Sequence, residues 1–340
     1  MSVRTDVMKD SAAVSVPATR RRTWVLPLLA LALLAVFALA LSVGSVPVSA
    51  AQLWQIVTGG DAGMAGEVVT TLRLPRALAA AACGGLLALA GALMQVLLRN
   101  PLADPYVLGI SGGAAVGALL AMLAGVTTAL LELSAFAGAL GAMLLVFGLA
   151  HGEGGRTSTR LLLTGVIVSA GCGAAVSFIL AVASEQSLRG MLFWLMGDAG
   201  AAGHPGLAVL TLMAGVIVCA PLARDLNLLA RGDFTAQTLG VPVAKLRLMI
   251  HLIASALTAV AVTTVGSVGF VGLIVPHLMR LALGNDQRLL LPASVLAGAI
   301  LLLLADTAAR TVIAPAQLPV GVLTALLGVP VFLFLLNRHR

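Results

Sequence analysis

The strongest constraint on this chain is a series of apolar stretches that recurs along its whole length. Most of them reach or approach the roughly 17–25 residues that a helix needs to cross a bilayer. Backbone groups surrounded by lipid must be satisfied internally, which favours helices. The sequence therefore predicts an all-α polytopic membrane protein with about ten transmembrane helices, at residues 24–43, 77–98, 107–123, 133–150, 161–182, 205–222, 248–265, 268–283, 289–305 and 319–336.

The composition agrees with a membrane protein. Of the 340 residues, 60% are hydrophobic and only 10% are charged, whereas a soluble domain has roughly 45–50% and about 25%. The net charge of +7 is scattered over short loops, so we expect no nucleic-acid partner. Cys83, Cys172 and Cys219 lie inside apolar runs without CxxC spacing, which predicts buried packing residues and no metal site or disulfide.

The N-terminal residues 1–22 are polar and end in the basic cluster Arg20, Arg21 and Arg22. We predict a cytoplasmic tail there, followed by one transmembrane domain over residues 23–340. A signal peptide is the alternative for the first apolar stretch, because Val48-Ser49-Ala50 resembles a cleavage site. That stretch is longer than the roughly 7–15 apolar residues of a signal peptide, which favours a retained helix.

The distribution of positive charge predicts the orientation. With the N-terminus in the cytoplasm, all but four of the 20 Lys and Arg residues fall in cytoplasmic segments. The positive-inside rule then places both termini in the cytoplasm. The four exceptions on the outer side are Arg73, Arg76, Arg189 and Arg310.

Two of the predicted spans, 107–123 and 268–283, are short and interrupted by glycine or proline. Irregular backbone at membrane depth requires protein or water around it, so we expect both inside the helix bundle. Leu72-Arg73-Leu74 and Leu246-Arg247-Leu248 open comparable halves of the chain. An inverted repeat is one explanation, but a single tripeptide leaves this open.

The sequence disfavours several classes of function. The spans carry almost no ionisable residue at mid-depth, which disfavours a proton- or sodium-driven secondary transporter. The two lysines, Lys9 and Lys245, do not follow glycine, so the chain has no Walker A loop for ATP. We therefore expect no enzyme activity in this chain. A secondary transporter and a structural membrane scaffold remain as alternatives.

Two longer polar segments suggest partner or substrate contacts. Residues 223–247 predict two short helices, broken at Gly232 and at Gly240-Val241-Pro242, with an apolar side for a partner subunit. A solvated loop is the alternative. On the outer side, residues 183–203 contain Trp194, which we interpret as an interfacial anchor or as part of a short amphipathic helix at a pore mouth.

Five motifs, taken in order, resemble the permease subunits of type II ABC importers for iron-siderophores, haem and vitamin B12. The resemblance covers nearly the whole chain after the N-terminal tail, and it does not specify the cargo. The motifs are LRLPR (72–76), RNPLADPYVLGISGGAAVG (99–117), RLLLTGV (160–166), GSVGFVGLIVPHLMRL (266–281) and ADTAARTV with LPVGVLTALLGVPVF (305–332).

This resemblance implies a permease in the bacterial inner membrane, with the vitamin B12 importer permease fold of ten helices per subunit. It implies a homodimer, two cytoplasmic ATPase subunits that hold ATP and magnesium, and a periplasmic substrate-binding protein. It implies no cofactor in this chain. We expect an iron complex as cargo, either haem or a ferric siderophore, with vitamin B12 as the alternative.

The resemblance also assigns residues by motif. Arginines that dock the binding protein match Arg73, Arg76 and Arg310, although the first two could simply anchor a helix end at the headgroups. The cytoplasmic gate matches Asn100, Pro101, Leu102, Ser158 and Thr159. The segment that couples to the ATPase matches Leu226, Arg231, Gly232, Asp233, Phe234, Leu239 and Gly240. Arg189 is a candidate for the substrate path, where it could meet a carboxylate of the cargo.

Overall fold

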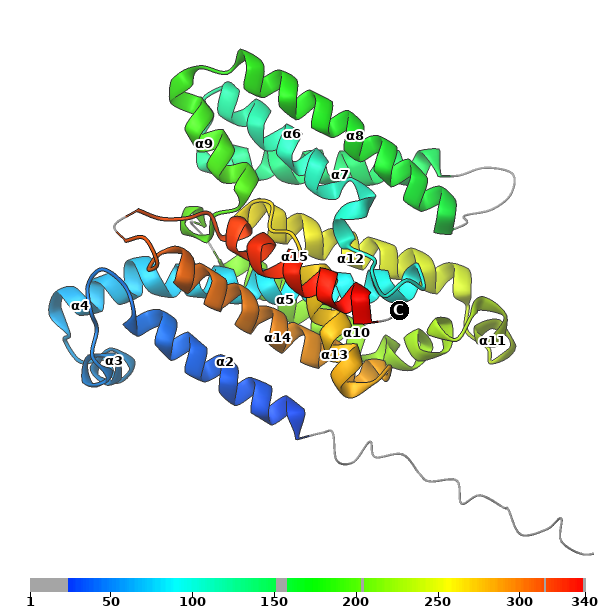
Figure 1. Ribbon diagram of the computed structural model, residues 1–340, viewed down its shortest axis with the longest axis horizontal. Helices are drawn as coiled ribbons and strands as arrows, with labels where there is room; N and C mark the ends of the chain where they lie inside the picture. The colour runs from blue at the N-terminus through cyan, green and yellow to red at the C-terminus, as the bar shows by residue number, and fades with distance from the viewer. Residues whose placement is uncertain (1–23, 151–157, 203–204, 315, 339–340) are drawn as a thin grey trace, which may run out of the picture.

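The computed structural model describes residues 24–150, 158–202, 205–314 and 316–338. Within these ranges all regular elements are helical (Figure 1). The elements are α2 (Val25–Ser42), α3 (Ala50–Val57), α4 (Gly63–Glu67), the π-helical turn η1 (Val68–Arg73), α5 (Leu74–Leu97), η2 (Pro105–Leu108), α6 (Ile110–Leu123), α7 (Thr128–Leu149), α8 (Ser158–Val182), α9 (Glu185–Met196), η3 (Ala199–Ala201), α10 (Gly206–Ala230), α11 (Asp233–Thr238), α12 (Val243–Val265), α13 (Val271–Leu283), α14 (Gln287–Ala309) and α15 (Val320–Arg338).

Helix α5 lies at the centre of the bundle. Nearly every residue from Ala77 to Leu97 is buried, and α5 packs against α10, α12, α13 and α14. Its small side chains explain this position, because alanine and glycine let neighbouring helices approach closely from every side. The most uniformly small and apolar of the predicted spans is therefore the one that the other helices surround.

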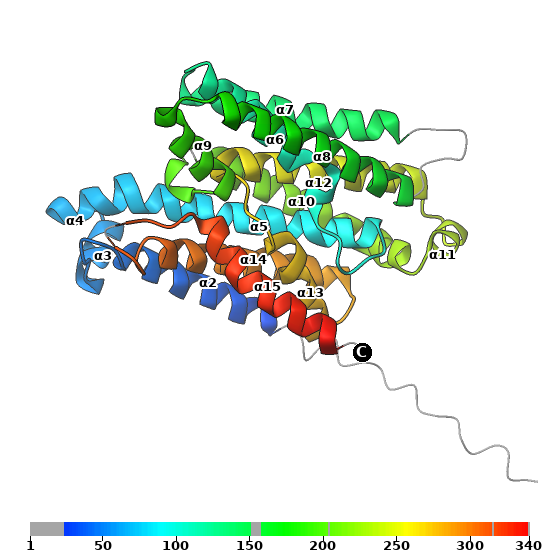
Figure 2. The ribbon, with the colours of Figure 1, turned by 45° about the horizontal axis from the view of Figure 1, so that its top comes forward.

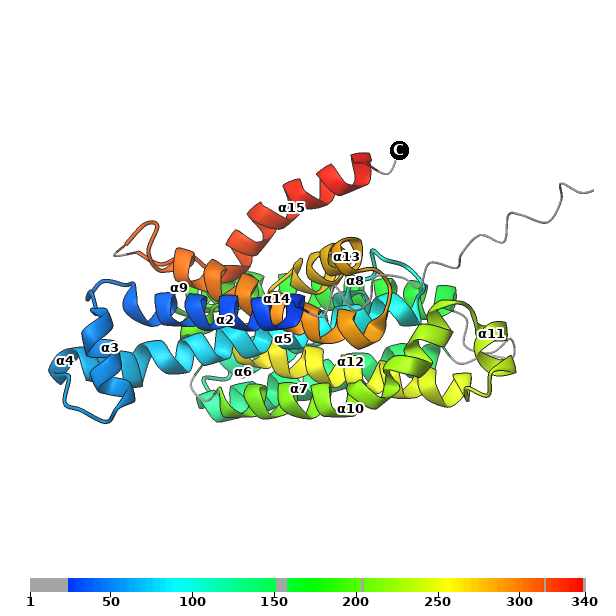
Figure 3. The ribbon, with the colours of Figure 1, turned by 90° about the horizontal axis from the view of Figure 1, so that it is seen from below.

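The remaining helices form a periphery around this core (Figures 1 and 2). Helices α6, α7, α8 and α9 make a separate group, and α6 and α7 connect it to the core through α12. Helix α2 packs along α14. Helix α15 diverges from the bundle, as Figure 3 shows. The most exposed apolar surfaces belong to α2 and α8, as expected for helices at the outside of a membrane bundle.

Two helix crossings are possible only because glycine faces glycine. Gly84 on α5 lies against the backbone of Gly298 on α14, and Gly91 on α5 lies against that of Gly272 on α13. A methyl group at either α5 position would overlap a carbonyl oxygen of the opposite helix. Gly84 and Gly91 therefore act as packing residues that allow close helix contact.

The prediction that spans 107–123 and 268–283 are interrupted and enclosed by protein agrees with the structure. The first begins with η2 and a left-handed turn at Gly109 before α6, and the second follows a left-handed turn at Phe270 before α13. The two breaks touch: the Tyr106 hydroxyl donates to Val268 O (2.9 Å) and accepts from Val268 N (3.0 Å). Each break thus satisfies backbone groups of the other, as buried irregular backbone requires.

Helix α5 differs from the prediction at its start. Arg73 and Arg76 do not open a helix, because α4, η1 and α5 form one helical rod from Gly63 to Leu97. Pro75 has no N–H to donate to the preceding turn. The helix nevertheless continues across this position, because the turn before Pro75 is π-helical and Leu74 N donates to Val69 O. The structure therefore lengthens this segment well beyond the predicted 77–98.

The ten predicted spans all correspond to apolar helices. Seven are long enough to cross a membrane, and Ile110–Leu123, Val271–Leu283 and Val320–Leu335 are shorter. The long helices run between two ends of the molecule (Figure 1). One end carries α3, α4 and η3 and is called the α3 end below. The opposite end carries α11 and is called the α11 end.

Candidate functional site

The α3 end contains a buried carboxylate shared by two arginines. Asp306 on α14 is 1% exposed, and its oxygens accept from Arg76 Nε on α5 at 2.9 and 3.1 Å. Arg310 Nε lies 3.8 Å from Asp306 Oδ2, one helical turn further along. Arg76 also donates to Gln317 Oε1 at 2.8 Å, and its Nη2 lies 3.8 Å from Asp198. Two of the predicted docking residues are therefore joined in one charged network.

Arg73 has a different environment from Arg76 and Arg310. Its side chain is 5% exposed and donates to the carbonyl oxygens of Leu41 (2.7 Å), Ser42 (3.0 Å) and Val46. Arg310 similarly donates to Ala40 O. The bonds to Ala40, Leu41 and Ser42 satisfy carbonyls that the end of α2 leaves without helical partners. In this conformation Arg73 ties α2 to η1 and presents almost no surface to another protein.

The sequence reasoning did not assign a role to Asp306 or Gln317. Asp306 follows directly after the predicted span 289–305. The spacing of Asp306 and Arg310, four residues apart on a helix, could have indicated an ion pair. The pairing of Arg76 with Asp306 joins residues 230 positions apart, and no local pattern reports it.

A cavity of about 580 Å³ also lies at the α3 end, between α6, α7, α9 and α12. Arg189 lines it together with Glu132, Asp198 and the aromatic Phe193, and the Arg189 guanidinium lies 5.8 Å from the centre of the Phe193 ring. The cavity therefore combines one cation, two carboxylates and an aromatic surface. Arg189 is exposed here, which leaves its charge accessible.

The structure corrects the interfacial-anchor interpretation of Trp194. The side chain is 8% exposed and belongs to the core, because α9 turns inward and Trp194 O meets the left-handed turn at Gly266. The alternative, a short helix at the mouth of a pore, matches α9 (Glu185–Met196) beside the cavity.

The α11 end holds the predicted gate residues of the second motif, 99–117. After α5, Arg99 adopts a left-handed conformation with φ 48°, and Asn100 Oδ1 accepts from Leu102 N at 2.9 Å. Asn100 and Pro101 are exposed, and the chain then returns into the bundle at Ala103. Ser158 and Thr159 form the first turn of α8, but their side chains lie outside the described residues.

The predicted gate and coupling segments approach each other at this end. A cavity of about 360 Å³ is lined by Leu97 at the end of α5, Leu161 near the start of α8 and Asp233 of α11. Asp233 also accepts a hydrogen bond from Arg247 on α12, at 2.9 Å. Segments that the sequence places 60 or more residues apart thus share one cavity.

The coupling segment has one short helix where two were predicted. Helix α10 continues past Pro221 to Ala230, so Leu226 and Leu229 lie fully buried in the bundle and do not form an outer apolar side. Helix α11 stands alone between turns with positive φ at Gly232 (121°) and Gly240 (83°). Phe234 is 81% exposed and Leu239 58% exposed, so these two carry the outward apolar surface.

The described residues contain no group of three or more His, Cys, Asp or Glu side chains that could hold a metal ion. The three cysteines are unpaired, and Cys83 and Cys219 are buried. Ion pairs lie at both ends of the bundle, and the core between them is mainly apolar.

Comparison with known proteins gives consistent matches over nearly the whole chain. The model of the FecCD transport family matches residues 32–338. The hemin transport system permease of Yersinia pestis is 43% identical over 307 residues, which is 88% of this chain and 91% of that protein. The cobalamin import permease of Halobacterium salinarum is 43% identical, covering 80% and 74%. The vitamin B12 import permease of Salmonella typhi is 39% identical, covering 92% and 94%.

A solved structure has the same fold. It is an inward-facing conformation of a metal-chelate type ABC transporter, with a TM-score of 0.81 and 32% sequence identity. The match covers 93% of this chain and 99% of the solved one. The arrangement of helices described above is therefore an established membrane permease architecture.

Proposed function

Because the chain belongs to the FecCD transport family and is an ABC importer permease, we propose that it conducts an iron complex, haem or a ferric siderophore, across the bacterial inner membrane. ATP hydrolysis then resides on a partner subunit. The observation that carries this proposal is the separation of charge. Among the described residues, two ends with ion pairs flank a core that is mainly apolar, which suits a bulky chelate moved by an external energy source.

The hemin permease among the relatives favours an iron complex, and the exposed Arg189 beside the aromatic Phe193 supports it. A guanidinium can pair with the carboxylates of haem or of a siderophore in a bidentate manner. The cobalamin permeases among the relatives support vitamin B12 as the second candidate. Cobalamin offers amides in place of carboxylates, so it would gain less from Arg189.

We further propose that the α11 end faces the cytoplasm and carries the ATPase subunits. Asn100, Pro101 and Leu102, with Ser158 and Thr159, would form the cytoplasmic gate beside α11. Arg231, Gly232, Asp233, Phe234, Leu239 and Gly240 would dock on the ATPase, with Leu226 holding α10 in the bundle. The exposure of Phe234 and Leu239 supports this, since isolated outward aromatic and aliphatic side chains on a short helix are typical of a binding surface.

At the α3 end we propose that the periplasmic binding protein docks on a rim that contains Arg76 and Arg310. Arg73 would support this rim by fixing α2. A second copy of the chain would complete the translocation path, with α8 and α15 as the candidate contact helices because both are apolar and poorly covered.

Reconstituted uptake tests the function and the cargo together. Proteoliposomes containing the permease and its ATPase, with the cognate binding protein outside, should accumulate haemin or a ferric siderophore only with ATP inside. Cobalamin is the comparison substrate, and Arg189→Gln should reduce uptake of the iron complex more than uptake of cobalamin. Uptake without ATP would indicate a secondary transporter, and failure to bind an ATPase would indicate a scaffold.

The docking proposal has its own test. Arg310→Gln should weaken binding of the substrate-binding protein by roughly fivefold to tenfold at low salt, and less at high salt, because rim charges are screened. Arg224→Gln, which removes an exposed arginine at the α11 end, is the matched control. Equal affinity of both variants would contradict docking at this rim.

A further inference from the structure

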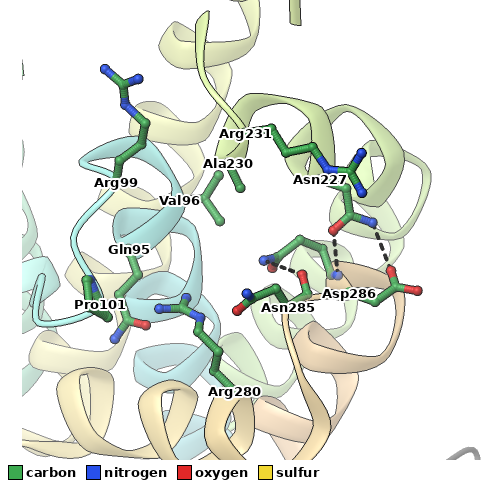
Figure 4. Close-up of a pocket in the computed structure, with 11 residues that line it drawn as sticks. Gln95, Val96, Arg99, Pro101, Asn227, Ala230, Arg231, Arg280, Asn285 and Asp286 are labelled. Atoms are coloured by element: carbon green, nitrogen blue, oxygen red, sulfur yellow. Dashed lines mark hydrogen bonds between the residues drawn. The ribbon is translucent and has the colours of Figure 1, made fainter. Parts of the chain in front are cut away.

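The α11 end contains a cavity of about 600 Å³ to which neither the gate nor the coupling motif assigns an occupant (Figure 4). It lies where α5, α10 and α13 end and where α14 begins. Its volume falls within the range of about 300–1,000 Å³ that is typical of small-molecule sites. The lining residues are Gln95, Val96, Arg99, Pro101, Asn227, Ala230, Arg231, Arg280, Asn285, Asp286 and Gln287.

Positive charge dominates the cavity. Arg99, Arg231 and Arg280 come from three different segments and line one space with a single carboxylate, Asp286. The Arg280 side chain is directed into this space, whereas the exposed side chains of Arg99 and Arg231 extend away from it at its rim (Figure 4). That carboxylate already accepts from Asn227 Nδ2 (2.8 Å) and from the backbone N of Arg288 (3.1 Å). In the part of the chain that the structure describes, none of the three arginine side chains forms an ion pair or a hydrogen bond. The cavity therefore has an unbalanced positive potential, which favours an anion.

Two buried side-chain amides set a second requirement for a ligand in this cavity, namely that it carries hydrogen-bond donors. Gln95 is 2% exposed and Gln287 1% exposed, and both line the cavity. Their Nε2 groups donate to Leu273 O (3.1 Å) and Asn285 O (3.4 Å), which orients the amides. The Oε1 atoms of both remain without a donor. A buried acceptor without a partner is costly, so an occupant that brings hydroxyl or amine hydrogens would satisfy the site.

We propose that this cavity binds a phosphate ester that also carries hydroxyl or amine groups. With the exposed Arg99 and Arg231 side chains turned inward beside Arg280, the phosphate oxygens would accept from the three guanidinium groups, whose planar forks suit phosphate. A rotation of the Gln95 and Gln287 amides would bring their Oε1 atoms, which have almost no exposed surface, to the hydroxyl or amine hydrogens. Such a ligand has two sources. One is the headgroup of a phospholipid such as phosphatidylglycerol, since basic pockets between helices at the cytoplasmic face bind anionic headgroups. The other is a soluble phosphate ester.

The position of the cavity gives the ligand a structural consequence. Pro101 belongs to the proposed gate loop and Arg231 to the proposed coupling segment, and both border the site. A bound phosphate would join these segments to the end of α13 through Arg280. The inference goes beyond the importer function, because transport of cargo does not require it.

The test uses the full-length protein purified in detergent and native mass spectrometry. Phosphatidylglycerol is titrated against phosphatidylcholine, which lacks both the net charge and the hydroxyl donors, and sn-glycerol 3-phosphate is the soluble probe. We expect Arg280→Gln and Arg99→Gln each to weaken binding of the phosphate ester roughly tenfold, the loss expected for one hydrogen bond to a charged group. Arg99 is exposed, so its variant is informative even if Arg280→Gln folds poorly. Arg224→Gln on α10, outside the cavity, should bind like the unaltered protein.

The outcomes separate the sources. Arginine-dependent binding of phosphatidylglycerol assigns the site to lipid, and arginine-dependent binding of sn-glycerol 3-phosphate alone assigns it to a soluble ester; either supports the proposal. Binding that is equal in all three variants overturns it. Loss of ATPase association in Arg280→Gln, without any change in phosphate-ester binding, also overturns it, because the cavity would then accept an acidic protein side chain.

Discussion

At the scale of single residues, the α3 end depends on Asp306. This carboxylate is buried between Arg76 and Arg310, and it connects α5 to α14. A buried charge pair contributes little net stability compared with an apolar pair, but removing one partner leaves the other charge uncompensated. Two of the three arginines that the resemblance assigns to docking, Arg76 and Arg310, are therefore also held in place by one acid.

We expect Asp306→Asn to destabilise the protein by about 3–5 kcal/mol, the usual cost of leaving a buried partner charge unpaired. Thermal unfolding of the detergent-solubilised protein measures this effect. Glu185→Gln removes an exposed acid in the first turn of α9 and should change stability by less than about 0.5 kcal/mol. Equal unfolding temperatures for the two variants would show that Asp306 does not hold the network together.

At the scale of helices, the close crossings of α5 explain its sequence. Glycine and other small residues occupy the faces of α5 that touch neighbouring helices. The carbonyl of Gly298 occupies the space that a side chain at Gly84 would need. In a bilayer, helices gain stability from close packing more than from the hydrophobic effect. A single enlarged residue at a crossing therefore acts on the whole helix pair.

Gly84→Leu should separate α5 from α14 and destabilise the fold by more than the roughly 1–3 kcal/mol of ordinary overpacking, because backbone atoms and not a flexible side chain block the space. The fraction of monodisperse protein after detergent extraction and its unfolding temperature report this change. Gly148→Leu on α7 is the matched control, since nothing lies within 4 Å of an added Cβ there. A monodisperse Gly84→Leu variant with unchanged stability would contradict the crossing.

Helix α11 gives the second prediction at this scale. Phe234→Ala should reduce association with the ATPase subunit and the coupling of ATP hydrolysis to transport, by roughly tenfold or more if Phe234 is a central aromatic contact. The fold should be unaffected, because Phe234 is exposed. Trp54→Ala removes an exposed aromatic residue at the opposite end and should leave ATPase association unchanged. Normal transport by Phe234→Ala would remove α11 from the coupling mechanism.

At the scale of the whole molecule, the arginines and lysines are divided between the two ends much as the positive-inside count predicts. Arg73, Arg76, Arg189 and Arg310 belong to the α3 end, whereas Arg99, Arg231 and Arg280 line the cavity at the α11 end. The structure shows which arginines lie at the same end of the molecule. The larger number of basic residues assigned to the cytoplasmic side is the reason for proposing that the α11 end faces the cytoplasm.

Cysteine labelling tests this orientation. Thr238→Cys on α11 should react with a membrane-impermeant maleimide only in inside-out vesicles, and Asp61→Cys beside α4 should react in intact, outer-membrane-permeabilised cells. Both positions are exposed. The unaltered chain, whose Cys83 and Cys219 are buried, gives the background. Labelling of Thr238→Cys from the outside would invert the proposed topology.

The sequence alone was sufficient for the class of protein, the positions of the ten apolar helices and the presence of two interrupted ones. These features depend on local composition, because a bilayer requires long apolar helices and because glycine and proline interrupt them wherever they occur. Motifs in the expected order were sufficient for the family. Helix boundaries were less accurate near Pro75, because a π-helical turn extends the predicted span 77–98 back to Gly63.

Only the tertiary structure decided which residues meet. The sharing of Asp306 by Arg76 and Arg310, the burial of Arg73 under the end of α2 and the inward position of Trp194 each join segments that are distant in the chain. The same holds for the cavity that Arg99, Arg231 and Arg280 line. Hydropathy and local propensity describe how one segment meets the bilayer, whereas contacts between segments depend on how helices pack, and single-sequence patterns do not encode that packing.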